Sequence, residues 1–146
     1  LDSGGDGSTW YGTATDIHDL KRTEEELRRS EERYRAFVAN SGEGIWCLEL
    51  EPPLDTTLPT EVQIDRVYAD GRFAECNEAM ARMYGFASAA ELLGQPLERL
   101  LPPDDPGVRA YLGSIVENGY VAQEAESQEV GADGTPRWFL NGVRGV

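Results

Sequence analysis

The side chains in this sequence that most often do chemistry are few, and they do not gather at catalytic spacings. There is one histidine, His18, and there are two cysteines, Cys47 and Cys76. No cysteine and histidine have the spacing of zinc ligands, so we predict no metal site and two reduced thiols. The adjacent acids Asp104 and Asp105 have no nucleophile or base beside them, which general acid–base catalysis would require. We therefore expect no catalytic residue and no enzymatic activity in this chain.

The acid pair is better explained as the start of a helix. Asp105 is followed by Pro106, and an aspartate N-cap with proline at the first helical position is a common helix start. The helix is predicted to run to about Asn118 and to end at Gly119. Its apolar face consists of Leu112, Ile115 and Val116.

Composition and charge exclude several classes of protein. The chain has 146 residues, about one domain, and carries 13 lysines and arginines against 27 aspartates and glutamates, for a formal net charge of −14. That charge opposes binding to nucleic acid or to an anionic membrane. No apolar run approaches the roughly 18 residues of a membrane span, and the N-terminus has no signal-peptide pattern. We therefore expect a cytoplasmic protein.

A charged amphipathic helix is predicted near the N-terminus, directly after a β-prone stretch at Ser8–Thr15. Asp16 caps this helix, which continues to about Ala39. Glu24 and Glu31 occupy a positions of its heptads and weaken the apolar seam. Two interpretations stay open, a coiled-coil linker that joins two protomers and a solvated helix on its own domain. The apolar heptad positions are Ile17, Leu20, Leu27, Tyr34 and Val38.

The rest of the chain predicts an α+β domain. Ser88 and Glu91 are spaced as a capping box, which marks the second of three short helices. Strands precede these helices and a hairpin follows them, so we expect an antiparallel sheet with helices on one face. The elements are a strand at 44–50, a proline-rich insert at 51–63, an extended segment at 64–76 with a turn at Asp70-Gly71, helices at 77–85, 88–94 and 105–118, and strands at 120–130 and 135–146.

Three motifs, in this order, resemble the PAS sensory domain. They are NEAMARMYGF from Asn77, SAAELLGQPLERLLPPDD from Ser88 and the hairpin GADGTPRWFLNG from Gly131. The resemblance covers roughly residues 32–146 and implies the PAS fold, with an antiparallel sheet of about five strands and short helices on one face. The positions that match the family pattern are Asn77, Ala79, Gly85, Phe86, Glu91, Leu92, Gly94 and Asp105.

The first residues resemble the end of another such unit, because WYGTATDIHDLKRTEEELRRSEERYR from Trp10 looks like a last strand and the linker helix after it. The segment Glu51–Tyr68 departs from the family, where a tight turn is usual. If the helix breaks near Ser30, residues 8–15 can complete the sheet of their own chain, and otherwise they can complete that of a second copy. The resemblance implies three parts, which are residues 1–15 as the closing strand of a preceding PAS unit, 16–39 as the linker or coiled-coil helix, and 40–146 as a PAS domain without its own last strand.

A small-molecule pocket between sheet and helices is also implied. The alternative is that its side chains pack on one another and leave no void. In the strand at 44–50 Trp46 alternates with Cys47, so we predict that Trp46 lies on the opposite face, where a dimer partner or a linker helix packs. The candidate pocket residues are Ile45, Cys47, Met80, Met83, Tyr84, Leu112, Ile115, Val116, Trp138 and Leu140.

The cofactor signatures of the family are absent, so we predict neither haem nor flavin and leave an unidentified small ligand open. Haem-binding members have a histidine on the long helix, and residues 106–118 contain none. Flavin photosensors use Asn-Cys-Arg, whereas this chain has Cys76-Asn77-Glu78. His18-Asp19-Leu20 resembles the phosphoacceptor box of histidine kinases over a few residues, but the acidic linker that follows favours a solvated histidine.

These observations predict a sensory and dimerisation module of a cytoplasmic signalling protein, in most cases a histidine kinase of a two-component phosphorelay. Linker helices would carry a conformational change to an output domain. We expect a homodimer that binds neither nucleic acid nor membrane. The alternative is a structural spacer or dimerisation module without a ligand, in a diguanylate cyclase or a transcriptional regulator.

Overall fold

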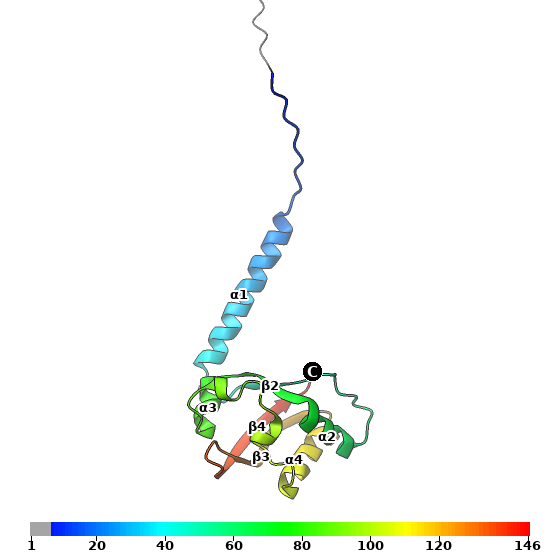
Figure 1. The fold of residues 1–146 in the computed structure, drawn as a ribbon, viewed down its shortest axis with the longest axis vertical. Coiled ribbons are helices and arrows are strands. Elements are labelled where there is room, and N and C mark those ends of the chain that lie inside the picture. The colour runs from blue at the N-terminus through cyan, green and yellow to red at the C-terminus, as the bar shows by residue number, and fades with distance from the viewer. Residues whose placement is uncertain (1–6) are drawn as a thin grey trace, which may run out of the picture. The chain divides into compact units, whose positions relative to one another are not determined.

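The computed structural model of the protein describes residues 7–146, which divide into two units (Figure 1). The first unit ends at Ala36, and the second runs from Phe37 to Val146. Of the elements formed by residues 7–146, the second unit contains the strands and every helix after the first. Part of the predicted closing strand, residues 1–6, lies outside the described residues.

Helix α1 (His18–Asn40) is continuous, and most of its side chains are exposed. The Asp16 carboxylate accepts a hydrogen bond from the His18 amide at 2.9 Å, as predicted for the cap. Ser30 lies in the uninterrupted helix, so the break considered at that residue is absent. Ion pairs between residues three or four apart, such as Arg29 with Glu25 at 2.9 Å, support the helix in solvent.

The predicted strand at Ser8–Thr15 is wrong for this chain. These residues form neither helix nor strand, and Trp10 and Tyr11 are 89% and 94% exposed. An isolated extended segment has no neighbouring strand to bind its amides and carbonyls, so β-propensity alone does not make it a strand. Its origin as the end of a preceding unit stays a prediction.

The insert contains a helix that the sequence analysis did not predict. Strand β1 (Trp46–Leu50) leads through a proline-rich loop to α2 (Thr60–Asp70), and β2 (Gly71–Cys76) follows at once. The extended segment predicted at 64–70 is therefore wrong. Residues 64, 67 and 68 have helical spacing, and α2 buries Ile64 to 1% exposure. Gly71 permits the direct change from helix to strand, because a Cβ there would lie 2.4 Å from the Val67 carbonyl oxygen.

Helix α2 is attached to the rest of the domain by polar contacts. The Gln63 amide donates to the Leu58 carbonyl at 2.6 Å and accepts from the Tyr120 hydroxyl. Arg109 of helix α4 (Pro106–Glu117) donates to Glu61 at 2.6 Å and to Asp65 at 3.0 Å. The insert is thus a folded part of the domain that packs against α4 (Figure 1).

The helices between the strands begin largely as predicted. Asn77 caps α3 (Glu78–Tyr84) through a hydrogen bond from the Met80 amide, and Gly85 ends it with a φ of 81° in the left-handed region that favours glycine. The predicted capping box differs, because the Ser88 side chain makes no capping bond and Glu91 accepts from the Ala87 amide instead. Two 3-10 helices follow, η1 (Ala89–Glu91) and η2 (Leu97–Arg99).

The strands form two antiparallel pairs. β1 pairs with β2, and β3 (Val121–Val130) pairs with β4 (Pro136–Arg144) as the predicted closing hairpin. The single sheet of about five strands is therefore not confirmed. Among residues 7–146, β1 and β4 each have one strand partner, so each keeps one unpaired edge.

The hydrophobic core lies beneath β2, α3 and α4, and Trp46 packs against it. The Trp46 ring meets Phe73 edge-on, with ring centroids 6.2 Å apart, and Leu48 packs against the same core. The predicted faces of β1 are thus reversed, and Trp46 belongs to the core side. The buried core residues are Phe73, Met80, Ala81, Tyr84, Phe86, Ala89, Leu92, Leu97, Leu100, Leu101 and Val108.

Replacing Asp105 with alanine is expected to lower the free energy of unfolding by about 1 kcal/mol, as measured by urea denaturation. The Asp105 carboxylate accepts from the amides of Gly107 at 2.7 Å and Val108 at 3.3 Å, which are otherwise unpaired at the start of α4. Asp104→Ala is the matched control and should change stability by less than about 0.5 kcal/mol. Equal losses in both variants would contradict the capping role.

Candidate functional site

A buried polar network connects α3 with the closing hairpin. We call it the Glu129 network, and it consists of Tyr84, Ser127, Glu129 and Asn141. The Tyr84 hydroxyl donates to Glu129 Oε2, and Ser127 Oγ donates to Glu129 Oε1 at 2.5 Å. Asn141 Nδ2 donates to Ser127 Oγ at 2.7 Å and to Glu129 Oε1 at 3.2 Å. Three side chains from different segments therefore bind one carboxylate.

Strand alternation and the end of α3 bring these side chains together. Ser127 and Glu129 lie two residues apart on β3, so both face the interior, where they are 4% and 5% exposed. Tyr84, the last residue of α3, is 3% exposed and stacks on Phe139 of β4 with ring centroids 4.3 Å apart. The network is thus part of the core rather than a surface cluster.

The phenols near Glu129 stay protonated at neutral pH. Burial raises the pKa of Tyr84 well above its usual range, and the charge of Glu129 raises it further. Burial also raises the pKa of Tyr111 to about 12, again with a contribution from Glu129. Tyr84 can therefore act only as a hydrogen-bond donor toward the carboxylate.

A second polar connection lies at the other end of α3. We call it the Asn77 junction, and it joins Asn77 to Val38, Glu43, Ile45 and Met80. Asn77 Nδ2 donates to the carbonyls of Val38 at 3.0 Å and Glu43 at 2.9 Å, while Oδ1 accepts from the amides of Ile45 at 3.0 Å and Met80 at 2.9 Å. Val38 belongs to the last turn of α1, so one buried side chain connects the end of α1 and the loop before β1 to the start of α3.

Helix α3 therefore has a long-range connection at each end. Tyr84 bonds to β3 at its C-terminus, and Asn77 bonds to the last turn of α1 and to the loop before β1 at its N-terminus. The helix has only seven residues. The Glu129 network and the Asn77 junction thus lie at the two ends of one short helix.

The structure brings part of the predicted pocket together. Met80 and Tyr84 are buried in the core, and the half-buried Leu112 packs against it. Ile115 is buried and Val116 is half-buried on α4. Ile45 and Cys47 are half-buried on β1 and its approach, and neither is among the side chains that pack on the core. Their place in a pocket stays a prediction.

Three of the predicted pocket residues are exposed on the surface. Met83, Trp138 and Leu140 are 39%, 70% and 64% exposed. On β4 the inward position is Phe139, so the residues on each side of it face outward. The prediction chose the more apolar pair and thereby the wrong face of the strand.

Sequence analysis missed Ser127, Glu129 and Asn141. The four central residues of the segment AESQEV are all polar, so its inward face has no apolar alternation to identify it. The available signal was that Ser127 and Glu129 lie two residues apart, which places both on one face of a strand. The strand that pairs with it contains Asn141. That signal becomes useful only when the register of the hairpin is known.

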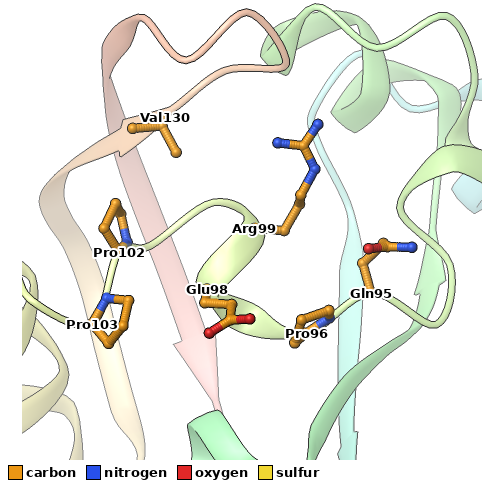
Figure 2. A pocket seen from close by; sticks show the side chains of 7 residues that line it. All are labelled: Gln95, Pro96, Glu98, Arg99, Pro102, Pro103 and Val130. Carbon is orange, nitrogen blue, oxygen red and sulfur yellow. The ribbon is translucent and has the colours of Figure 1, made fainter.

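A shallow depression on the surface lies near η2 (Figure 2). Three of the seven residues that line it are prolines, and the labelled Glu98 and Arg99 side chains point in different directions. The Arg99 guanidinium lies 4.9 Å from the centre of the Phe86 ring, so this cation already has a partner. The residues that line the depression are Gln95, Pro96, Glu98, Arg99, Pro102, Pro103 and Val130.

Residues 7–146 contain neither a candidate metal cluster nor a candidate membrane span. No group of three or more histidine, cysteine, aspartate or glutamate side chains in this part of the chain could hold a metal ion. Within the same residues, no helix has the length and apolar character needed to cross a membrane.

The fold and the site define a small α+β domain in which short helices and antiparallel strands enclose a polar network. A family model described as PAS fold matches residues 62–144. The chain therefore belongs to the PAS fold family. No curated protein gives a significant match to it. Membership in this family supports a sensory or signalling role.

Proposed function

We propose that this chain is a sensory and dimerisation module of a cytoplasmic signal-transduction protein of the two-component type, with no catalytic activity of its own. The observation that carries the proposal is the pair of long-range connections at the two ends of α3. They give the interior of the domain a direct route to the last turn of α1. A signal-transducing module requires such a route between its sensing site and its linker helix.

The proposed mechanism has two steps. A signal at the Glu129 network changes the hydrogen bond between Tyr84 and Glu129, and α3 then shifts. Asn77 caps the start of α3, so this shift also moves the Asn77 side chain. The hydrogen bonds from Asn77 to the Val38 and Glu43 carbonyls then change, and the last turn of α1 changes its position. The attached output domain responds to the new arrangement of the linker helices.

We further propose that dimers form through α1. Residues 18–40 contain six acidic and six basic side chains, whereas residues 41–146 contain 18 acidic and seven basic ones. Two strongly acidic domains repel each other, while two neutral helices do not. Along α1, Leu20, Leu27 and Tyr34 are 57%, 61% and 51% exposed and supply the apolar contact.

Neither haem nor flavin is part of the proposed function. The helix α4 contains no histidine, and Cys76 donates its thiol hydrogen to the Ala89 carbonyl at 3.3 Å. Burial raises the pKa of Cys76, which opposes formation of a reactive thiolate. The proposed signal is therefore a small molecule bound without either cofactor.

A chimeric kinase tests the proposal. Residues 1–146 would replace the PAS module of a soluble, dimeric histidine kinase. Tyr84→Phe and Glu129→Gln are each expected to change the autophosphorylation rate by at least about fivefold, because they alter the connection between β3 and α3. Glu126→Gln, an exposed glutamate on the same strand, is the matched control and should leave the rate unchanged. Equal rates in all four proteins would contradict a sensory role.

The second candidate function is a structural spacer in a diguanylate cyclase or a transcriptional regulator. It is favoured by the close packing of the predicted pocket side chains, because Met80, Tyr84 and Ile115 are each less than 7% exposed. Native mass spectrometry of the protein purified from cells separates the two functions. A retained small molecule supports the sensor, and bare protein together with an unresponsive chimera supports the spacer.

A further inference from the structure

The apolar stripe of α1 is exposed to solvent along the helix. Leu20, Leu27 and Tyr34 occupy the d positions of successive heptads, and each is more than half exposed. The helix is continuous from His18 to Asn40, and none of its residues is buried. If a second copy of α1 covers this stripe, the two helices can run parallel or antiparallel, and the charges beside the stripe distinguish these orientations.

These charges alternate on one side of the stripe and are absent from the other. Acidic a positions and basic e positions follow one another on the first side, while the g positions on the second side are uncharged. The acidic a positions are Glu24 and Glu31, the e positions are Lys21, Arg28 and Arg35, and the g positions are Thr23, Ser30 and Phe37.

A parallel pair would give the two glutamates no cation from the second copy. In that orientation each a position faces the same a position of the other helix, with d and g positions beside it. Glu24 would face Glu24 of the second copy, and Glu31 would face Glu31. Like charges that face each other oppose association. The basic e positions would lie beside the uncharged g positions of the other helix.

An antiparallel pair supplies these cations. Each a position then lies opposite a d position of the other helix, and the e position that follows this d position lies beside it. With Glu24 opposite Leu27 of the second copy, Arg28 of that copy lies beside Glu24. The same alignment places Glu31 beside Lys21 of the second copy. Because the pair is symmetric, each of these contacts occurs twice.

The net charge of the second unit favours the same orientation. Residues 41–146 carry 18 acidic and seven basic side chains, so two copies repel each other. In the antiparallel alignment the two copies of Phe37, where the second unit begins, lie about 35 Å apart along the pair. In a parallel pair they lie about 10 Å apart. The longer separation is several times the Debye length of about 8 Å, so salt screens the repulsion.

We propose that α1 binds a second copy of itself in the antiparallel orientation, through the apolar stripe and the alternating charges beside it. The inference rests on the proposed function, because it specifies how the proposed dimer forms. Within its own helix Lys21 binds Glu24 at 3.0 Å, and Arg28 binds Glu32 at 2.7 Å. These pairs are exposed, so exchanging them for partners on the other helix costs little.

Charge reversal tests the orientation. Analytical ultracentrifugation of the full chain measures the dimer dissociation constant. Arg28→Glu is expected to weaken the dimer by at least about tenfold, because it places two pairs of like charges at the interface. Adding Glu24→Arg to this variant restores opposite charges, so the double variant should bind within about threefold of the unchanged protein.

Arg29→Glu is the matched control. Arg29 shares its intrahelical partner Glu25 with Arg28, but it occupies an f position on the far side of the helix from the stripe. The control has the same change in net charge and should weaken the dimer by less than about threefold.

Disulfide cross-linking gives an independent measurement, in protein with serine at positions 47 and 76. The antiparallel alignment places position 20 opposite position 31, whereas each of these positions lies about 16 Å from its own copy. A disulfide requires Cα atoms within about 7 Å. Leu20→Cys and Glu31→Cys should therefore form a covalent dimer when the two variants are mixed and none when either is oxidised alone.

Three results would overturn the inference and leave a dimer through α1 standing. They are equal weakening by Arg28→Glu and Arg29→Glu, a covalent dimer of either cysteine variant alone, and no covalent dimer in the mixture. A monomeric unchanged protein would overturn both the antiparallel orientation and the proposed dimerisation through α1.

Discussion

Replacing Asn77 with alanine is expected to lower the free energy of unfolding by about 3 kcal/mol. The Asn77 side chain makes four hydrogen bonds while it is 4% exposed, two as donor and two as acceptor. Alanine leaves the amides of Ile45 and Met80 and the carbonyls of Val38 and Glu43 without these partners. Urea denaturation followed by circular dichroism measures the loss.

Asn118→Ala is the matched control for this prediction. Asn118 is exposed, and its side chain donates a single hydrogen bond to the Ser114 carbonyl at 2.7 Å. Its removal should cost less than about 0.5 kcal/mol. A loss at Asn77 no larger than the loss at Asn118 would show that the Asn77 junction contributes little.

Replacing Tyr84 with alanine is expected to lower the free energy of unfolding by about 4 kcal/mol. The Tyr84 ring is 3% exposed and stacks on Phe139, so its removal leaves a cavity between α3 and β4. It also removes one of the donors that bind the Glu129 carboxylate. Thermal denaturation monitored by calorimetry measures the combined loss.

Tyr84→Phe separates the ring from the hydroxyl. This variant keeps the stacking on Phe139 and loses the hydrogen bond to Glu129, so we expect a loss of about 1 to 2 kcal/mol. Equal losses in Tyr84→Ala and Tyr84→Phe would mean that the ring contributes nothing. That result would contradict the position of Tyr84 in the packed core.

The sequence predicted the helix starts at Asp16 and Asp105, the helix end at Gly85 and the closing hairpin because their signals are local. Asp105 with Pro106, and Asn77 with Gly85, specify the starts and the end of helices through contacts within a few residues. The hairpin follows in the same way from the glycine-rich turn at 131–134. The PAS family was recognised from these same segments, and the family match confirms it.

The helix in the insert could not be predicted in this way. The prolines at positions 52, 53 and 59 predict an irregular insert, but all three precede α2, so only the first part of the insert is irregular. Residues 64–76 contain β-branched and aromatic side chains, which favour strands locally. Packing of Ile64 and the contacts of Gln63 with Leu58 and Tyr120 favour the helix, and these contacts depend on the tertiary fold.

The Glu129 network could not be predicted because it depends on strand register. A shift of one residue reverses the faces of a strand, and the apolar pair Trp138 and Leu140 suggested the wrong face of β4. With Phe139 inward, Asn141 also faces inward and reaches Ser127 and Glu129. The same error placed exposed residues in the predicted pocket and omitted the buried carboxylate.

Amide hydrogen exchange at Ile45 tests the central claim most directly, which is that α3 connects the Glu129 network to the Asn77 junction. The Ile45 amide donates to Asn77 Oδ1 at 3.0 Å, so its exchange rate reports on this junction. Tyr84→Phe and Asp105→Ala should lose similar global stability, but Asp105 caps α4 and does not contact α3. We predict that Ile45 exchanges about fivefold faster in Tyr84→Phe than in Asp105→Ala, as measured by nuclear magnetic resonance. Equal exchange of Ile45 in the two variants would contradict the account.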